Sequence, residues 1–246
     1  MQSQATKAWA GRSWIGTSGF SYKEWKGSFY PEDIRNDAML SYYASKLSSV
    51  EINNTFYRLP RASVVEGWAA EVPSDFRFTI KASKRITHIK RLKEADDEVS
   101  YLLDTISTLG PRLGVVLYQL PPNFKIDLDR LGNLLKLIPD GFRSVLEFRH
   151  ESWTDDAVVE LLREHNAALC LADVDDAPEP QLIATADFGY LRLRRAAYTD
   201  AELAGWVDKV QAQTGWQDVY VYFKHEDGGS GPAMAVTFRK LIEGSQ

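Results

Sequence analysis

"SVLEFRHESW", residues 144–153, begins as a buried β-strand and ends in ionisable side chains. Its apolar start is typical of a strand that is covered on both faces, yet Glu147, Arg149 and His150 follow before any turn residue. A charged group costs several kcal/mol to bury unless it is paired. This stretch therefore indicates a strand whose carboxyl end delivers polar groups to a shared site.

Similar β-rich runs recur along the chain, and most are separated by stretches with apolar residues at helical spacing. The expected strands cover residues 14–20, 49–56, 76–83, 115–122, 144–150, 168–173, 190–195 and 219–226. The expected helices cover residues 38–47, 64–72, 98–109, 128–138, 155–165 and 201–211. Residues 173–187 are too rich in Pro and Asp for a helix, and they predict a loop or a short helical turn.

This alternation over 246 residues fits a closed (β/α)8 TIM barrel, which is an α/β fold. We expect a single domain over residues 1–246, with residues 1–12 as an N-terminal extension. An open doubly wound sheet is the alternative. When it binds dinucleotides, that fold places a G-x-G-x-x-G turn after its first strand. The sequence GTSGF (16–20) does not match that turn, which favours the barrel.

Composition and charge restrict the classes of partner. A net charge of -5 argues against wholesale electrostatic binding to nucleic acid or an anionic membrane. No run approaches the roughly 18 apolar residues of a membrane span, and the N-terminus lacks the apolar core of a secretory signal, so a cytoplasmic protein is expected. The single cysteine excludes an internal disulfide. The 4 histidines form no H-x-H or H-E-x-x-H pattern, so we expect no transition-metal site and no cofactor, although carboxylate-bound magnesium stays open.

Side chains alternate along a strand, so each expected strand has one apolar and one polar face. The apolar face should pack on the helices. The polar face should point into the barrel, toward the carboxyl ends of the strands, where barrel enzymes hold their active sites; we call this end the mouth. The residues assigned to the interior are Glu51, Asn53, Lys81, Gln119, Glu147, Arg149, Asp173, Arg192, Arg194 and Lys224. Cys170 falls on the opposite, helix-facing side.

Candidate catalytic residues each have a structural alternative. Glu147, Glu51 and Asp173 either act as general acid or base in a partly desolvated mouth, which raises a carboxyl pKa, or form salt bridges that fix the strand register. His150 begins the loop over the mouth and is the best proton shuttle, with loop capping as its alternative. Lys81 either forms a Schiff base as an amine nucleophile or pairs with Glu51 or Asp173.

Basic residues outnumber acidic ones in this layer, which favours a site for a small anionic ligand such as a phosphate or carboxylate. The residues expected to bind the polar groups of a substrate are Arg149, Arg192, Arg194, Lys224, Asn53 and Gln119. Residues 225–234 are compatible with a glycine-rich phosphate turn before a helix, and equally with a loop. Tyr22, Trp25 and Tyr57 are the aromatic residues chosen for ligand contact, with capping of the barrel as the alternative.

Several stretches together resemble the YecE-like family, domain of unknown function 72. They are GTSGFSYKEWKGSFYP (16–31), VEINNTFYRLP (50–60), KASKRITH (81–88), LGPRLGVVLYQLPPNF (109–124), EFRHESW (147–153), LAD (171–173) and TADFGYLRLR (185–194). The resemblance implies a (β/α)8 barrel and no particular reaction. The sequence departs from the family at Arg194-Arg195, where a His-Gly pair is usual, and at Lys224-His225, where asparagines are usual. If these positions touch a ligand, the departures imply altered specificity or lost activity.

Two functions therefore stay open. The first is a metal-independent enzyme, a lyase, isomerase or hydrolase, that acts on a small phosphorylated or carboxylated substrate at the mouth. The second is a non-catalytic module that binds a metabolite or a nucleic-acid fragment at the same place. An enzyme needs an acid or base in a closed pocket, whereas a module that binds a nucleic-acid strand needs an open basic groove lined by aromatic side chains.

Overall fold

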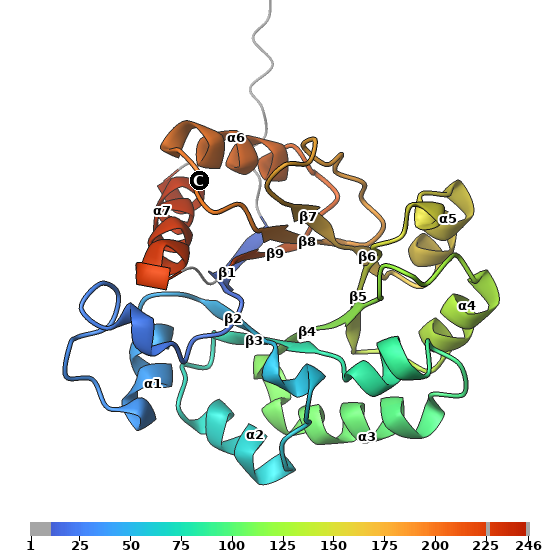
Figure 1. Ribbon diagram of the computed structural model, residues 1–246, viewed down its shortest axis with the longest axis horizontal. Coiled ribbons are helices and arrows are strands. Elements are labelled where there is room, and N and C mark those ends of the chain that lie inside the picture. Colours follow the sequence, from blue (N-terminus) through green and yellow to red (C-terminus); the bar gives the residue numbers. More distant parts are fainter. Residues whose placement is uncertain (1–10, 225–226, 245–246) are drawn as a thin grey trace, which may run out of the picture.

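Parallel strands form the centre of the fold, and helices surround them (Figure 1). The computed structural model describes residues 11–224 and 227–244. The strands are β1 (Arg12–Thr17), β2 (Ser49–Ile52), β3 (Arg77–Lys81), β4 (Leu113–Gln119), β5 (Arg143–Glu147), β6 (Ala168–Leu169), β7 (Leu171–Asp173), β8 (Phe188–Leu193) and β9 (Asp218–Phe223). The N-terminal extension expected over residues 1–12 lies mostly outside the described residues, and Arg12 already belongs to β1.

The strands form two sheets, with the orders β1-β9-β8-β7 and β2-β3-β4-β5-β6. A parallel bridge between Ser18 and Glu51 joins β1 to β2. At the other junction, β6 and β7 are separated only by Cys170, whose backbone N–H donates to the carbonyl of Leu146 at 2.9 Å. Since β6 and β7 together occupy one strand position, the fold is the predicted TIM barrel, and the open-sheet alternative is wrong.

The helices follow the strands as expected. They are α1 (Met39–Ala44), α2 (Ala62–Ala70), α3 (Asp96–Ile106), α4 (Leu128–Lys136), α5 (Asp156–Glu164), α6 (Asp200–Gln211) and α7 (Ser230–Gly244). Residues 174–187, between β7 and β8, contain no helix, which confirms the loop predicted from Pro and Asp. Within the described ranges, no helix has the length and apolar character needed to cross a membrane.

Strand alternation separates two sets of buried side chains. Leu146, Leu191 and Val221 belong to the large core between the strands and the helices. A second apolar cluster lies inside the barrel and comprises Trp14, Val115, Leu117, Val145, Ala168, Phe188, Tyr190, Tyr220 and Tyr222. Several of these residues come from the first halves of their strands, so this cluster fills the amino-terminal part of the barrel below the polar layer.

One strand departs from the predicted alternation. Cys170 packs against the interior cluster, whereas Leu171 belongs to the helix-facing core. Asp173 shares the face of Leu171, so the prediction that it points into the barrel is wrong. Its carboxylate instead accepts a hydrogen bond from the Tyr198 hydroxyl at 2.8 Å and pairs with Arg195 at 2.9 Å. These partners outside the barrel explain why a buried charge is tolerated there.

Candidate functional site

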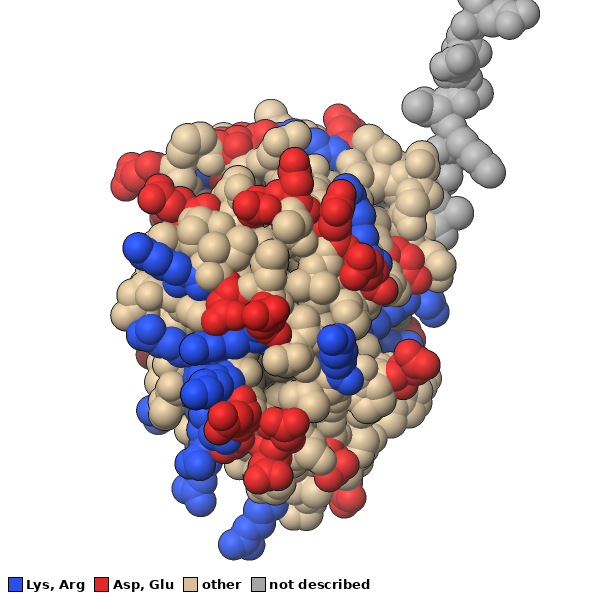
Figure 2. All heavy atoms as spheres, turned by 90° about the vertical axis from the view of Figure 1, so that its right-hand side faces the viewer, with Lys and Arg blue, Asp and Glu red and all other residues tan. Residues whose placement is uncertain are grey.

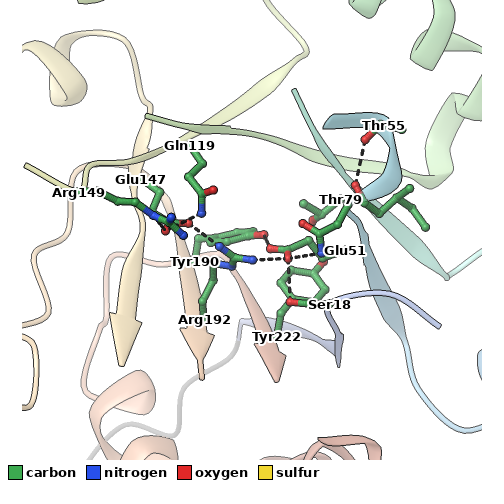
Figure 3. A network of polar contacts seen from close by, with 12 residues as sticks. Ser18, Glu51, Thr55, Thr79, Gln119, Glu147, Arg149, Tyr190, Arg192 and Tyr222 are labelled. Atoms are coloured by element: carbon green, nitrogen blue, oxygen red, sulfur yellow. Dashed lines mark hydrogen bonds and ion pairs between the residues drawn. The ribbon is translucent and has the colours of Figure 1, made fainter. Parts of the chain in front are cut away.

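Arg192 lies between two glutamates inside the barrel (Figure 3). Its Nη1 donates to Oε2 of Glu147 at 2.6 Å, and its Nη2 donates to Oε1 of Glu51 at 2.8 Å. The three residues come from β8, β5 and β2, and their exposed fractions are 1%, 4% and 0%. The planar guanidinium can present separate donors to two carboxylates, which a compact ammonium group cannot do with the same geometry.

Glu51 is held by several donors besides Arg192. Its Oε1 accepts hydrogen bonds from the Ser18 hydroxyl at 2.8 Å and from Asn53 Nδ2 at 3.0 Å, and its Oε2 accepts one from the Tyr190 hydroxyl. Burial acts to raise the pKa of Glu51, but the Arg192 charge and these hydrogen bonds outweigh burial and hold the pKa below its usual value. Glu51 is therefore an ionised, fully engaged carboxylate.

Glu147 has a similar environment. Its Oε1 accepts hydrogen bonds from Gln119 Nε2 at 2.7 Å and from Arg149 Nε at 3.1 Å. Burial opposes ionisation, yet Arg192, Arg149 and the hydrogen bonds lower the pKa of Glu147 to about 2. A general acid or base works best when its pKa lies near the working pH. The geometry thus favours the ion-pair alternative for both glutamates over a role in proton transfer.

Lys81 reaches the same layer from the end of β3, and it joins no ion pair with the residues that the structure describes. Its Nζ lies 4.4 Å from the centre of the Phe56 ring. Within the described part of the chain, no carboxylate lies within ion-pair distance of Lys81, and Arg192 engages both glutamates. Burial, followed by the Arg192 charge, lowers the pKa of Lys81 to about 8, although Glu51 and Glu147 act in the opposite direction.

Arg194 is a second cation with no carboxylate partner in the described ranges. It follows β8, two residues after Arg192, and its side chain is partly buried. Burial and then the Arg192 charge lower the pKa of Arg194, while Glu51 and Glu147 act to raise it. Lys224 follows β9, and its backbone N–H donates to Leu193 at 3.2 Å. Lys224 and His225 are one of the two places where the sequence departs from the family, and His225 lies outside the described residues.

Reasoning from the sequence overlooked His88. This histidine lies in the π-helical turn Arg85–Ile89, and its ring packs edge-on against Phe56 at 4.8 Å between centroids. Burial, Lys81 and Arg149 lower the pKa of His88, so its neutral form is favoured. π-Helical turns occur often at functional sites. The only signal in the sequence was the position of His88 in the stretch KASKRITH.

His150 is not part of this layer. It precedes the short helix Glu151–Trp153, and its Nδ1 accepts a hydrogen bond from the Ser152 backbone N–H at 3.1 Å. Its side chain lines a separate pocket of about 260 Å³ together with Trp153 and Cys170. The structure thus favours loop capping, the alternative to a proton shuttle.

The three aromatic candidates have different surroundings. Trp25 is only 1% exposed and packs in the core, which corrects the expected ligand contact in favour of capping. Tyr57 is 71% exposed, and Lys84 lies over its ring at 5.7 Å. Tyr22 donates to the carbonyl of Ser18 at 2.8 Å and, with Asn53, lines a pocket of about 230 Å³. Burial, followed by Glu51, raises the pKa of Tyr22 to about 12.

The glycine-rich turn before α7 packs closely against the loop after β1. Gly229 has a φ of +82°, and a Cβ atom at this position would lie 2.5 Å from the Ser28 hydroxyl oxygen. A larger residue would therefore clash as well as adopt a strained backbone conformation. Part of the predicted phosphate turn, residues 225–226, lies outside the described residues, and the phosphate assignment there stays a prediction.

The sequence was compared with family profiles and with curated proteins. The sequence profile described as "Protein of unknown function DUF72" matches residues 14–246. UPF0759 protein YecE of Escherichia coli (strain K12) is 38% identical over 112 residues, which cover 45% of this chain and 41% of that protein. UPF0759 protein YunF of Bacillus subtilis (strain 168) is 29% identical over 148 residues, which cover 57% of this chain and 51% of that protein. The chain thus spans about half the length of these curated relatives.

Two solved structures have the same architecture. A DUF72 family protein of Thermotoga maritima MSB8 superposes with a TM-score of 0.84 at 29% identity, covering 94% of this chain and 99% of the other. A DUF72 family protein of Enterococcus faecalis V583 gives a TM-score of 0.78 at 20% identity, covering 94% and 95%, and this likeness concerns the fold alone. Because the profile covers nearly the whole chain, this protein belongs to the DUF72 family.

Proposed function

We propose that the mouth of the barrel binds a small anionic substrate, phosphorylated or carboxylated, and that the protein is an enzyme acting on it. One observation carries the proposal: Lys81 and Arg194 lie near the same pair of glutamates, but Arg192 already forms ion pairs with both. Arg149 adds a further positive charge beside Glu147. The layer therefore has more cations than carboxylates, and a bound anion would compensate the difference.

Unsatisfied polar atoms support the same proposal. Arg192 Nε and Asn53 Oδ1 are buried, and neither has a hydrogen-bond partner among the described residues. Buried polar atoms in proteins are usually paired with protein groups, water or a ligand. The donor on Arg192 suits an anion or an ordered water, and the acceptor on Asn53 suits a ligand hydroxyl or amide.

The proposal assigns fixed roles to the glutamates. Ionised Glu51 and Glu147 hold Arg192 in one orientation, so its unpartnered Nε–H can donate to a ligand from a fixed position. Within the described ranges, no group of three His, Cys, Asp or Glu side chains is placed to hold a metal ion. The anion is assigned to the guanidinium and ammonium groups because they supply the excess positive charge of the layer. Proton transfer is assigned to groups with pKa values nearer neutrality than those of the glutamates.

A non-catalytic binding module is the second candidate, and exposed Tyr57 beside Lys84 is the observation that favours it. A single-stranded nucleic acid would need several stacking side chains along a basic groove. Figure 2 shows basic and acidic side chains interspersed over the face that includes α4 and α5, with Lys and Arg gathered along its left edge. Trp25 is buried and cannot stack on a base, so the aromatic side chains support such a strand poorly and the enzyme is the better supported candidate.

Thermal unfolding in phosphate tests the proposed anion site. Inorganic phosphate should raise the melting temperature of the wild type more than sodium chloride does at equal ionic strength, because a ligand of the folded state stabilises it. The additional increase should be lost in Arg194→Gln and retained in Arg35→Gln, which changes an exposed arginine paired with Asp37. Identical responses to phosphate and chloride in the wild type would overturn the proposal.

A further inference from the structure

We infer that Lys81 is a nucleophilic amine that forms a Schiff base with an aldehyde or ketone carrying a carboxylate or phosphate. This inference rests on the proposed function, since the anionic group would be held by Arg194 and its neighbours while the carbonyl carbon meets Lys81. It adds the chemical class of the substrate and the covalent step to the anion site.

The backbone of Lys81 is fixed on both sides. Its carbonyl accepts a hydrogen bond from the Thr55 hydroxyl at 2.7 Å, and the next residue, Ala82, donates from its N–H to Leu117 at 2.9 Å. Phe56, which follows β2, lies under the ammonium group. The side chain thus starts from a rigid strand end and extends along an apolar ring, which is the kind of support that a reactive group requires.

The surroundings of Lys81 favour a neutral amine. The cations whose charge acts on Lys81 are Arg192 of β8 and Arg149, which follows β5, and His88 lies close to it in the turn after β3. Glu51 and Glu147 approach from β2 and β5, but both are engaged by Arg192. Partial burial and neighbouring cations are the two conditions that activate a lysine as a nucleophile. The lowered pKa of Lys81, about 8, agrees with this environment.

The chemical step uses only the amine and the carbonyl compound. The nitrogen lone pair of neutral Lys81 forms a bond to the carbonyl carbon, and the carbonyl oxygen takes up a proton. Loss of the second N–H proton and departure of that oxygen as water leave a C=N bond, so atoms balance without an oxidant or reductant. Protonation of this imine gives an iminium ion, whose charge the nearby glutamates can stabilise.

Two other roles would use the same lysine without a covalent bond. Lys81 could act as a general base, or it could contribute only its charge to the anion site. Neither role produces an adduct that a hydride donor can trap. Reductive trapping therefore separates the inference from both alternatives.

The experiment treats the wild-type protein with sodium cyanoborohydride and one of two probes. Glyoxylate carries an aldehyde and a carboxylate, whereas acetaldehyde has the same number of carbon atoms and no charge. Peptide mass spectrometry then measures labelling at each lysine. Lys84, exposed and three residues along the same segment, is the internal reference. Lys81→Arg and Lys84→Arg are the matched variants.

Glyoxylate should label Lys81 about tenfold faster than Lys84, since the anion site raises the local concentration of the aldehyde and the amine is more often neutral. Lys81→Arg should abolish this rapid labelling, and Lys84→Arg should leave it unchanged. Arg194→Gln should slow labelling of Lys81 by glyoxylate and not by acetaldehyde.

Other outcomes distinguish the two proposals. Equal labelling of Lys81 and Lys84 by glyoxylate, in a protein that phosphate stabilises, would overturn the Schiff base and leave the anion site standing. Selective labelling of Lys81 by both probes at one rate, with no phosphate effect, would overturn the anionic substrate class and the proposed function together. Because the decisive comparison uses wild-type protein, it does not depend on the folding of any variant.

Discussion

Arg192 Nη1 donates a hydrogen bond to Glu147 Oε2 at 2.6 Å inside the barrel, where the two residues are only 1% and 4% exposed. The same guanidinium also engages Glu51. One cation thus serves two buried carboxylates, and removal of Arg192 leaves both of them without their shared partner.

Glu147→Gln should lower the free energy of unfolding by about 3 kcal/mol, because Arg149 and Arg192 lose a charged partner in the interior. Urea unfolding at neutral pH measures the change. Glu151→Gln alters an exposed glutamate at the start of the short helix Glu151–Trp153 and should change stability by less than about 0.5 kcal/mol. Similar stability of the two variants would contradict the structural role of Glu147.

Glu147→Gln should also change how the free energy of unfolding depends on pH in the acidic range. The pKa of Glu147 falls from 4.5 to about 2 in the folded state, so its contribution is complete above about pH 4.5 and is lost as the pH falls toward 2. Glu147→Gln should therefore lose less unfolding free energy across this window than the wild type. Parallel curves for both proteins would show that Glu147 does not titrate as the structure indicates.

Arg192→Met should destabilise the protein by about 4 kcal/mol, because it strands two buried carboxylates. Adding Glu51→Gln and Glu147→Gln to this variant should recover much of the loss, since the interior then holds no uncompensated charge from the triad. Chemical unfolding of the single and triple variants measures this coupling. The coupling would be contradicted if the triple variant lost as much unfolding free energy as the three single variants lose in sum.

Lys81→Met should raise the free energy of unfolding at pH 7 by about 1 kcal/mol, because it removes a partly buried cation that has no carboxylate partner in the described structure. The pKa of Lys81 falls from 10.5 to about 8, so the unfolded chain binds more protons between these values and wild-type stability should rise with pH there. The variant should lack that rise. Lys84→Met is the exposed control. If the free energy of unfolding of the wild type rose with pH no more steeply than that of the Lys81 variant, the lowered pKa assigned to Lys81 would be contradicted.

Strand alternation predicted much of the interior layer from sequence. In four strands a polar residue of the layer alternates with apolar neighbours: Glu51, Lys81, Glu147 and Arg192. Each of these strands runs without interruption through the layer. Such a pattern determines which side chains share a face. It therefore predicted which of these side chains approach one another inside the barrel.

Alternation could not determine every face or partner. The interruption at Cys170 leaves a short strand on which Asp173 turns outward, where Arg195 and Tyr198 bind it. The sequence also left Lys81 free to pair with Glu51, whereas the geometry gives that carboxylate to Arg192. Pairing depends on reach and donor geometry across strands that are distant in the sequence, and no local pattern contains that information.

Calorimetric titration of inorganic phosphate into the wild type and into Arg194→Gln, at fixed ionic strength, tests the anion site most directly. The account predicts one saturable site in the wild type and an affinity at least about tenfold lower in the variant, because a charge-assisted hydrogen bond contributes about 1.5 kcal/mol or more. Saturable binding with the same affinity in both proteins, or no saturable binding to the wild type, would contradict the anion site at the mouth.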